Sequence, residues 1–151
     1  MIAGNFHSHS LFSDGKKEIR ELVVRAIEIG FEHLGISDHA PVPFNNAWSM
    51  DQEAPNEYIS ETEKLKSLYA EQINIYRSLE IDYIPGITRS FKTVAESFVL
   101  DYVIGGIHQV KAEGDRGLWF IDGPGDGYDE GLKELFDGDV KKAVKAYYNQ
   151  L

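Results

Sequence analysis

The chain of 151 residues is long enough to bury one hydrophobic core, and its 42% hydrophobic content is ordinary for a globular protein. Its net charge of −10 argues against a nucleic-acid-binding surface, which normally carries a basic face, and no segment has the apolar length of a membrane span. The absence of cysteine excludes disulfides and thiolate metal sites. The N-terminus lacks the pattern of a signal peptide, so the expected location is the cytoplasm.

Strand-like and helix-like segments alternate along the chain. Apolar character predicts strands over residues 2–6, 33–37, 73–84, 100–107 and 118–121. Residues 41–55 favour an irregular loop, and residues 122–127 favour a Gly-rich turn. The alternation indicates an α/β fold with mostly parallel strands.

Three helices are expected, two between these strands and one after the last strand. Apolar residues recur at helical spacing over residues 16–29, up to a terminating Gly30. A second helix is predicted over residues 56–69, with Asn56 as its N-cap. Asp139 is expected to cap a last helix, whose predicted inner face is Val140, Ala143, Val144, Tyr147 and Leu151.

The segment His7-Ser8-His9, followed by Ser13-Asp14-Gly15, is the strongest chemical signal in the sequence. Side chains two residues apart in a strand point to the same face, so His7 and His9 are expected to converge. Two imidazoles beside a carboxylate are natural ligands for zinc, iron or manganese. An isolated His-x-His is also common on a polar strand edge, and this segment alone leaves both interpretations open.

Three more polar residues lie at or near the ends of predicted strands, where sites are built in parallel α/β folds: His39, Glu80 and His108. Each has a structural alternative. His39 could be a turn histidine paired with Asp38, Glu80 could face water on an alternating strand, and His108 could be a core histidine. His33 has no comparable placement and is interpreted as structural.

Five segments together resemble the polymerase and histidinol phosphatase (PHP) superfamily, and in detail its histidinol-phosphatase branch. The matching segments are His7–Gly15, Ile36–Pro41, Leu79–Gly86, Asp101–His108 and Trp119–Pro124. The resemblance implies a distorted (β/α)7 barrel with up to three divalent ions, of zinc, iron or manganese, at the C-terminal end of its strands. It implies six ligands: His7, His9, Asp14, His39, Glu80 and His108.

Carried over motif by motif, the resemblance gives these residues distinct roles. His7 and His9 would hold the first ion, and Glu80 would bridge it to a second, because a carboxylate can bridge two cations. These three residues are expected to form the best-preserved site. A cluster of divalent ions can polarise a phosphoryl oxygen and stabilise a leaving oxygen.

The remaining residues complete the implied site. His108 would bind the second ion, and Asp14 and His39 would hold the third. Asp38 and Asp82 would orient ligands without binding an ion themselves.

The implied activity is hydrolysis of a small phosphorylated substrate, L-histidinol phosphate, to L-histidinol and phosphate in histidine biosynthesis. Two alternatives remain open. One is a PHP phosphoesterase that acts on nucleotides, and the other is an inactive module that binds metal or assembles with a partner. No nucleic-acid or membrane partner is expected.

The family pattern continues beyond Leu151, with a further histidine and a late Asp-x-His. The sequence is therefore interpreted as a single PHP-type domain over residues 1–151, truncated before the last strands of the barrel. Activity is expected to be impaired, because each ion would lack one protein ligand. Open sheet edges lead us to expect a homo-oligomer.

Overall fold

The computed structural model of the chain describes residues 3–123 and 125–151. Ile2 and Pro124, which the sequence assigns to a strand and a turn, lie outside the described residues. The chain forms two compact units, the first reaching to Ile81 and including Arg89–Ile104, the second comprising Asp82–Thr88 and Gly105–Leu151. Within the described residues, no helix has the length and apolar character needed to cross a membrane. The expectation of one domain stays a prediction.

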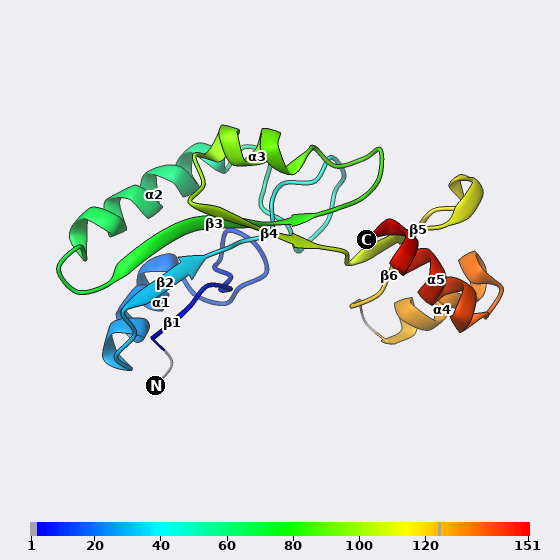
Figure 1. Cartoon of the computed structure of the whole chain (residues 1–151), viewed down its shortest axis with the longest axis horizontal. Helices are drawn as coiled ribbons and strands as arrows, with labels where there is room; N and C mark the ends of the chain where they lie inside the picture. Colours follow the sequence, from blue (N-terminus) through cyan, green and yellow to red (C-terminus); the bar gives the residue numbers. More distant parts are fainter. Residues whose placement is uncertain (1–2, 124) are drawn as a thin grey trace. The chain divides into compact units, whose positions relative to one another are not determined.

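A four-stranded sheet carries the first part of the chain. Its strands are β1 (Gly4–Asn5), β2 (His33–Ile36), β3 (Asn74–Asp82) and β4 (Tyr102–Gly106), in sequence order across the sheet (Figure 1). β1 pairs with β2, and β2 with β3, in parallel. The predicted α/β class with mostly parallel strands is thus confirmed.

Three helices cover this sheet: α1 (Ile19–Glu28), α2 (Pro55–Leu68) and α3 (Phe91–Phe98). Figure 1 shows α2 and α3 along the long strand β3. Their apolar stripes share one core with β2 and β3, because burying such stripes is the main stabilising contribution of an amphipathic helix. The core includes Ile19, Val23, Ala26, Leu34, Ile36, Tyr58, Leu65, Leu79, Ile81, Val94 and Phe98.

The helix ends differ from their predicted positions. α1 begins at Ile19 rather than residue 16, with Glu18 as N-cap, and the chain leaves the helix at Gly30, whose φ of +81° favours glycine. Asn56 is not the N-cap of α2, so that prediction is wrong. Ala54 takes this place, and Pro55 follows in the first turn, where a missing N–H costs little.

The loop and strand predictions hold with shorter bounds. The irregular loop predicted over residues 41–55 is present and ends at Ala54, one residue before α2 begins. α3 was not predicted, although Ser90 caps it by accepting a hydrogen bond from the Thr93 N–H at 3.2 Å. Its eight residues are too few to give a clear helical period.

The second unit contains an antiparallel pair of strands, β5 (Gln109–Lys111) and β6 (Leu118–Phe120). The short 3-10 helix η1 (Glu113–Asp115) lies between them, and helices α4 (Gly125–Phe136) and α5 (Val140–Gln150) follow. A separate small core holds these elements together, built from Val110, Ala112, Trp119, Phe136 and Ala143.

Helix α4 contradicts part of the sequence prediction. The Gly-rich segment 122–127 was expected to be a turn, but α4 begins within it, at Gly125. Glycine weakens a helix, yet it also allows close packing. At Gly131 a Cβ would lie 2.6 Å from Cδ1 of Trp119. Packing against Trp119 therefore overrides the low helix propensity.

Helix α5 starts where the sequence predicts. Asp139 caps it by accepting hydrogen bonds from two backbone N–H groups, at 2.9 and 3.1 Å. Of the predicted inner face, Ala143 is fully buried and Tyr147 packs against the small core. The prediction is wrong for three residues that are largely exposed: Val140, Val144 and Leu151.

Candidate metal centre

The loop that follows β1 carries His7, His9 and Asp14. β1 ends at Asn5, so the two histidines lie beyond the strand, and the strand geometry predicted for them is wrong. Their rings nevertheless converge, with centroids 5.1 Å apart. Gly15 allows the loop to fold back closely on itself, because a Cβ there would lie 2.3 Å from the carbonyl oxygen of His9.

Asp38, a fully buried residue just after β2, anchors this loop. Its Oδ1 accepts hydrogen bonds from the Ser10 N–H at 2.7 Å and the Ser13 hydroxyl at 2.6 Å, and its Oδ2 accepts one from the Ser10 hydroxyl at 2.8 Å. Ser37 adds two further links, since its hydroxyl accepts the Ser8 N–H at 3.0 Å and its N–H donates to the Ser8 carbonyl at 2.8 Å. These contacts fix the loop against the end of β2.

Glu80, on β3, is the point on which the imidazoles converge. Its Oε2 lies 2.9 Å from Nε2 of His7, 3.1 Å from Nε2 of His9 and 3.8 Å from Nε2 of His39. Only 4% of Glu80 is exposed, so the alternative in which it faces water is wrong. His39 is also buried, and a parallel β-bridge pairs it with Glu80. A buried carboxylate among three imidazoles is an arrangement suited to a cation.

The donor atoms around His9 fit a divalent metal ion. Its Nε2 is buried and, within residues 3–123 and 125–151, has no hydrogen-bond partner, because Glu80 Oε2 lies outside hydrogen-bond geometry. Its Nδ1 lies 2.7 Å from Oδ1 of Asp14. A carboxylate on one ring nitrogen fixes the tautomer that leaves the other nitrogen available to a metal. One potential ligand atom each from His7, His9 and Glu80 lie within 4.8 Å of one another.

The electrostatics of His9 lead to the same conclusion. The nearby carboxylate of Glu80 raises the pKa of His9 to about 9, burial opposes this rise, and Asp14 adds to it. The metal-free site therefore holds a proton at neutral pH. A divalent cation placed among these side chains would supply the positive charge that the proton supplies here.

His9, Asp14 and His39 form a second group of possible ligands, again within 4.8 Å of one another. Asp14 also contacts the ring of His9, so it can orient that ring. The predicted role of Asp14 and His39 as ligands of a third ion stays a prediction. The ring of Trp48 meets that of His39 edge-on, with centroids 5.1 Å apart, a contact that the sequence did not indicate.

His108 follows β4 and belongs to the second unit, together with Asp82. Nδ1 of His108 lies 2.7 Å from Oδ1 of Asp82, which is almost fully buried. This contact can orient the imidazole of His108, in keeping with the supporting role expected of Asp82. The predicted sharing of a second ion between Glu80 and His108 stays a prediction.

Beyond Asp38 and Asp82, sequence reasoning did not identify the residues that support the site. Ser8, Ser10 and Ser13 alternate with the histidines and Asp14, and this alternation was the available signal. Tyr58 gave no signal beyond its place on the inner face of α2. Its hydroxyl lies within hydrogen-bond distance of backbone carbonyl oxygens at two neighbouring strands.

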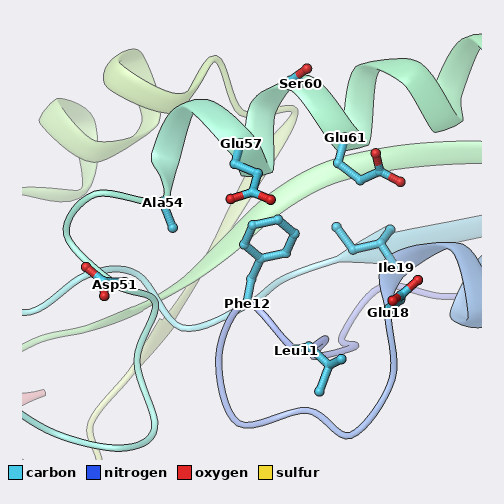
Figure 2. A pocket seen from close by; sticks show the side chains of 9 residues that line it. All are labelled: Leu11, Phe12, Glu18, Ile19, Asp51, Ala54, Glu57, Ser60 and Glu61. Atoms are coloured by element: carbon cyan, nitrogen blue, oxygen red, sulfur yellow. The ribbon is translucent and has the colours of Figure 1, made fainter.

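A separate cavity of about 650 Å³ lies beside the N-termini of α1 and α2 (Figure 2). Figure 2 shows the ring of Phe12 and, next to it, the carboxylate of Glu57. Its lining comprises Leu11, Phe12, Glu18, Ile19, Asp51, Ala54, Glu57, Ser60 and Glu61. None of the predicted metal ligands is among these residues.

A family model and several known proteins align with most of this chain. A model of the PHP domain family matches residues 5–151. A protein of Deinococcus radiodurans named "Probable histidinol-phosphatase" is 30% identical over 131 residues, which cover 85% of this chain and 46% of that protein.

Two solved structures share the fold. A candidate histidinol phosphatase from Listeria monocytogenes aligns with a TM-score of 0.76 and 23% identity, over 97% of this chain and 59% of its own. A histidinol phosphate phosphatase from Lactococcus lactis, solved with zinc, L-histidinol and phosphate, aligns with a TM-score of 0.59 and 24% identity, over 89% and 52%. The expected fold, an incomplete distorted barrel, is confirmed. The chain spans about half the length of these relatives.

Proposed function

The chain belongs to the PHP domain family, and from this premise we propose that it is the metal-binding part of a phosphomonoester hydrolase. The proposed reaction is hydrolysis of L-histidinol phosphate to L-histidinol and phosphate. The observation that carries the proposal is the convergence of His7, His9 and His39 on the buried carboxylate of Glu80. Support for the substrate comes from the relatives named as histidinol phosphatases.

Each residue of the site has a physical task in this proposal. Divalent cations bound here would polarise a phosphoryl oxygen and offset the charge that develops on the leaving oxygen. Glu80 supplies a negative charge in a buried position, where its field is weakly screened. Asp14 holds the ring of His9 so that Nε2 faces Glu80, and His7, about half-exposed, is the ligand nearest to solvent.

The metal is proposed as zinc, iron or manganese. Neutral imidazole and carboxylate ligands suit these ions, and the Lactococcus relative was solved with zinc. The residues His7, His9 and Glu80 would hold the first ion. His108, Asp14 and His39 are proposed as further ligands, with Asp38 and Asp82 in supporting positions.

Phosphate release from L-histidinol phosphate by the purified chain, with added manganese or zinc, tests the proposal. A nucleoside monophosphate in the same assay separates this activity from that of a nucleotide phosphoesterase. Glu80→Gln is expected to abolish release, whereas Glu71→Gln, a change of the same chemistry at an exposed turn, is expected to leave it unchanged.

Three results have distinct meanings. Release from L-histidinol phosphate that depends on Glu80 supports the proposal. Preference for the nucleotide would favour a phosphoesterase of different specificity. Tight metal binding without turnover of either ester would contradict an enzymatic role and favour a metal-binding module.

A further inference from the structure

The pairing of β2 with β3 is interrupted where the metal-ligand loop attaches. The continuous ladder ends at Ile36, which pairs with Arg77, and pairing resumes as the single bridge between His39 and Glu80. The two strands advance equally across the gap, so their register is kept. A backbone hydrogen bond supports the bridge, because the Glu80 N–H donates to the Asp38 carbonyl at 3.0 Å.

Two residues at the interruption hold the loop. Ser37 exchanges hydrogen bonds with Ser8, and the side chain of Asp38 holds Ser10 and Ser13, as described above. A continuous ladder would keep the bond from Ser37 to Ser8 but would add one bond to β3, from the Asp38 N–H to the Ser78 carbonyl. That added bond would pull the backbone of Asp38 toward β3.

Tyr58, from α2, occupies the interruption with a buried hydroxyl group. The hydroxyl lies 2.6 Å from the carbonyl oxygen of Ser78, its nearer acceptor, and 3.0 Å from that of Ile36. Burial raises the pKa of Tyr58 well above its usual value, and the charge of Asp38 adds to the rise, so the hydroxyl keeps its proton. A side-chain donor thus serves the Ser78 carbonyl, which a continuous β-ladder would otherwise satisfy.

The ring of Tyr58 also contacts the metal-ligand loop itself. It meets the ring of Phe12 edge-on, with centroids 5.3 Å apart. The Phe12 N–H in turn donates to the Ser10 hydroxyl at 3.2 Å. Tyr58 therefore supports both the strand interruption and the loop between His9 and Asp14.

We infer that Tyr58 is a positioning residue of the metal site: its hydroxyl maintains the interruption between β2 and β3 that lets Asp38 hold the ligand loop. This inference rests on the proposed metal-binding function, but its structural part concerns the metal-free chain as well. Without the hydroxyl, the Ser78 carbonyl would lack a donor and would favour closure of the ladder onto the Asp38 N–H. Asp38 would then be drawn away from Ser10.

Tyr58→Phe tests this inference, because it keeps the ring and removes only the hydroxyl. Thr62→Val is the matched control: Thr62 is a buried residue one turn along α2, and its hydroxyl donates within the helix, to Tyr58 and Ile59 carbonyls. Cobalt(II) binding, followed by its visible absorption, reports on the metal site. Amide hydrogen exchange at Ser8 and Ser10 reports on the loop in the metal-free chain.

In Tyr58→Phe we expect cobalt affinity to fall by about 10-fold or more, with a changed absorption spectrum, and Ser10 to exchange faster. Thr62→Val should leave both properties near wild type at equal thermal stability. Asp38→Asn, which weakens the loop attachment while leaving Tyr58 in place, should repeat the effect of Tyr58→Phe and serves if that variant does not fold.

Two results would overturn the inference. One is a folded Tyr58→Phe variant whose cobalt affinity and Ser10 exchange rate equal those of the wild type. If that variant does not fold, the same result in Asp38→Asn has this meaning. The other is an equal loss in Thr62→Val, which would show a general effect of α2. If the wild-type chain binds no cobalt but Tyr58→Phe still loses protection at Ser10, the positioning role stands and the proposed metal function fails.

Discussion

Replacing Glu80 with glutamine removes the charge around which the site is built while keeping the side chain's shape. The carboxylate faces three imidazoles at 2.9 to 3.8 Å and has little access to water. In the metal-free chain it hydrogen-bonds His7 and lies beside His9, whose pKa it raises to about 9. The variant should therefore change the pH dependence of the free energy of unfolding, and it should also weaken metal binding.

The magnitude follows from the pKa of His9. A rise from 6.5 to about 9 corresponds, at about 1.4 kcal/mol per pH unit, to at most ~3.5 kcal/mol. Asp14 provides part of this rise, and partly exposed His9 is screened by solvent, so we expect Glu80 to contribute about 1–2 kcal/mol. Because the folded pKa is raised, this stabilisation is complete below pH 6.5 and is lost as the pH rises to about 9.

Urea unfolding with a chelator present, at several pH values from about 6 to 9, measures this contribution. The free energy of unfolding of Glu80→Gln, relative to that of Glu71→Gln, should rise by about 1–2 kcal/mol from about pH 6 to about pH 9. The reason is that Glu71→Gln, which keeps Glu80, loses its charge pair over this range. Zinc affinity of Glu80→Gln should fall by at least ~100-fold. A stability difference that does not vary with pH, together with unchanged zinc affinity, would refute the reasoning.

Two further predictions concern the loop and the assembly. Gly15→Ala should destabilise the chain by more than ~1 kcal/mol and weaken zinc binding, because a Cβ would lie 2.3 Å from the carbonyl oxygen of His9. A variant with the melting temperature and zinc affinity of the wild type would contradict this close packing. The chain should also be a homo-oligomer, most simply a two-fold dimer, since large hydrophobic side chains such as Phe6, Val103 and Tyr148 are exposed. Light scattering that gives a monomer mass at high concentration would oppose it.

The sequence predicted the fold class and the approximate positions of these strands because both depend on local pattern. The residues His39, Glu80 and His108 follow or end apolar runs, and such positions in parallel sheets lie at one edge. The convergence of His7 and His9 was predicted for a wrong reason. They meet in a loop rather than on a strand, and the loop takes its shape from contacts with residues such as Asp38, far along the sequence.

The features that sequence reasoning missed depend on tertiary contacts. Helix α4 begins at a glycine that weakens any helical signal, and the fit of Gly131 against Trp119 compensates only in the folded chain. The role of Tyr58 follows from carbonyl groups on two strands, and no periodicity reveals it. Pairings between distant residues are invisible in a single sequence unless a known motif implies them.

Anomalous diffraction from crystals grown with zinc or manganese tests the central claim most directly. The account predicts that the strongest metal peak lies among His7, His9 and Glu80, within about 2.0–2.2 Å of their ligand atoms. Crystals that bind metal elsewhere, with the Glu80 carboxylate directed to bulk solvent and no peak beside His9, would contradict it.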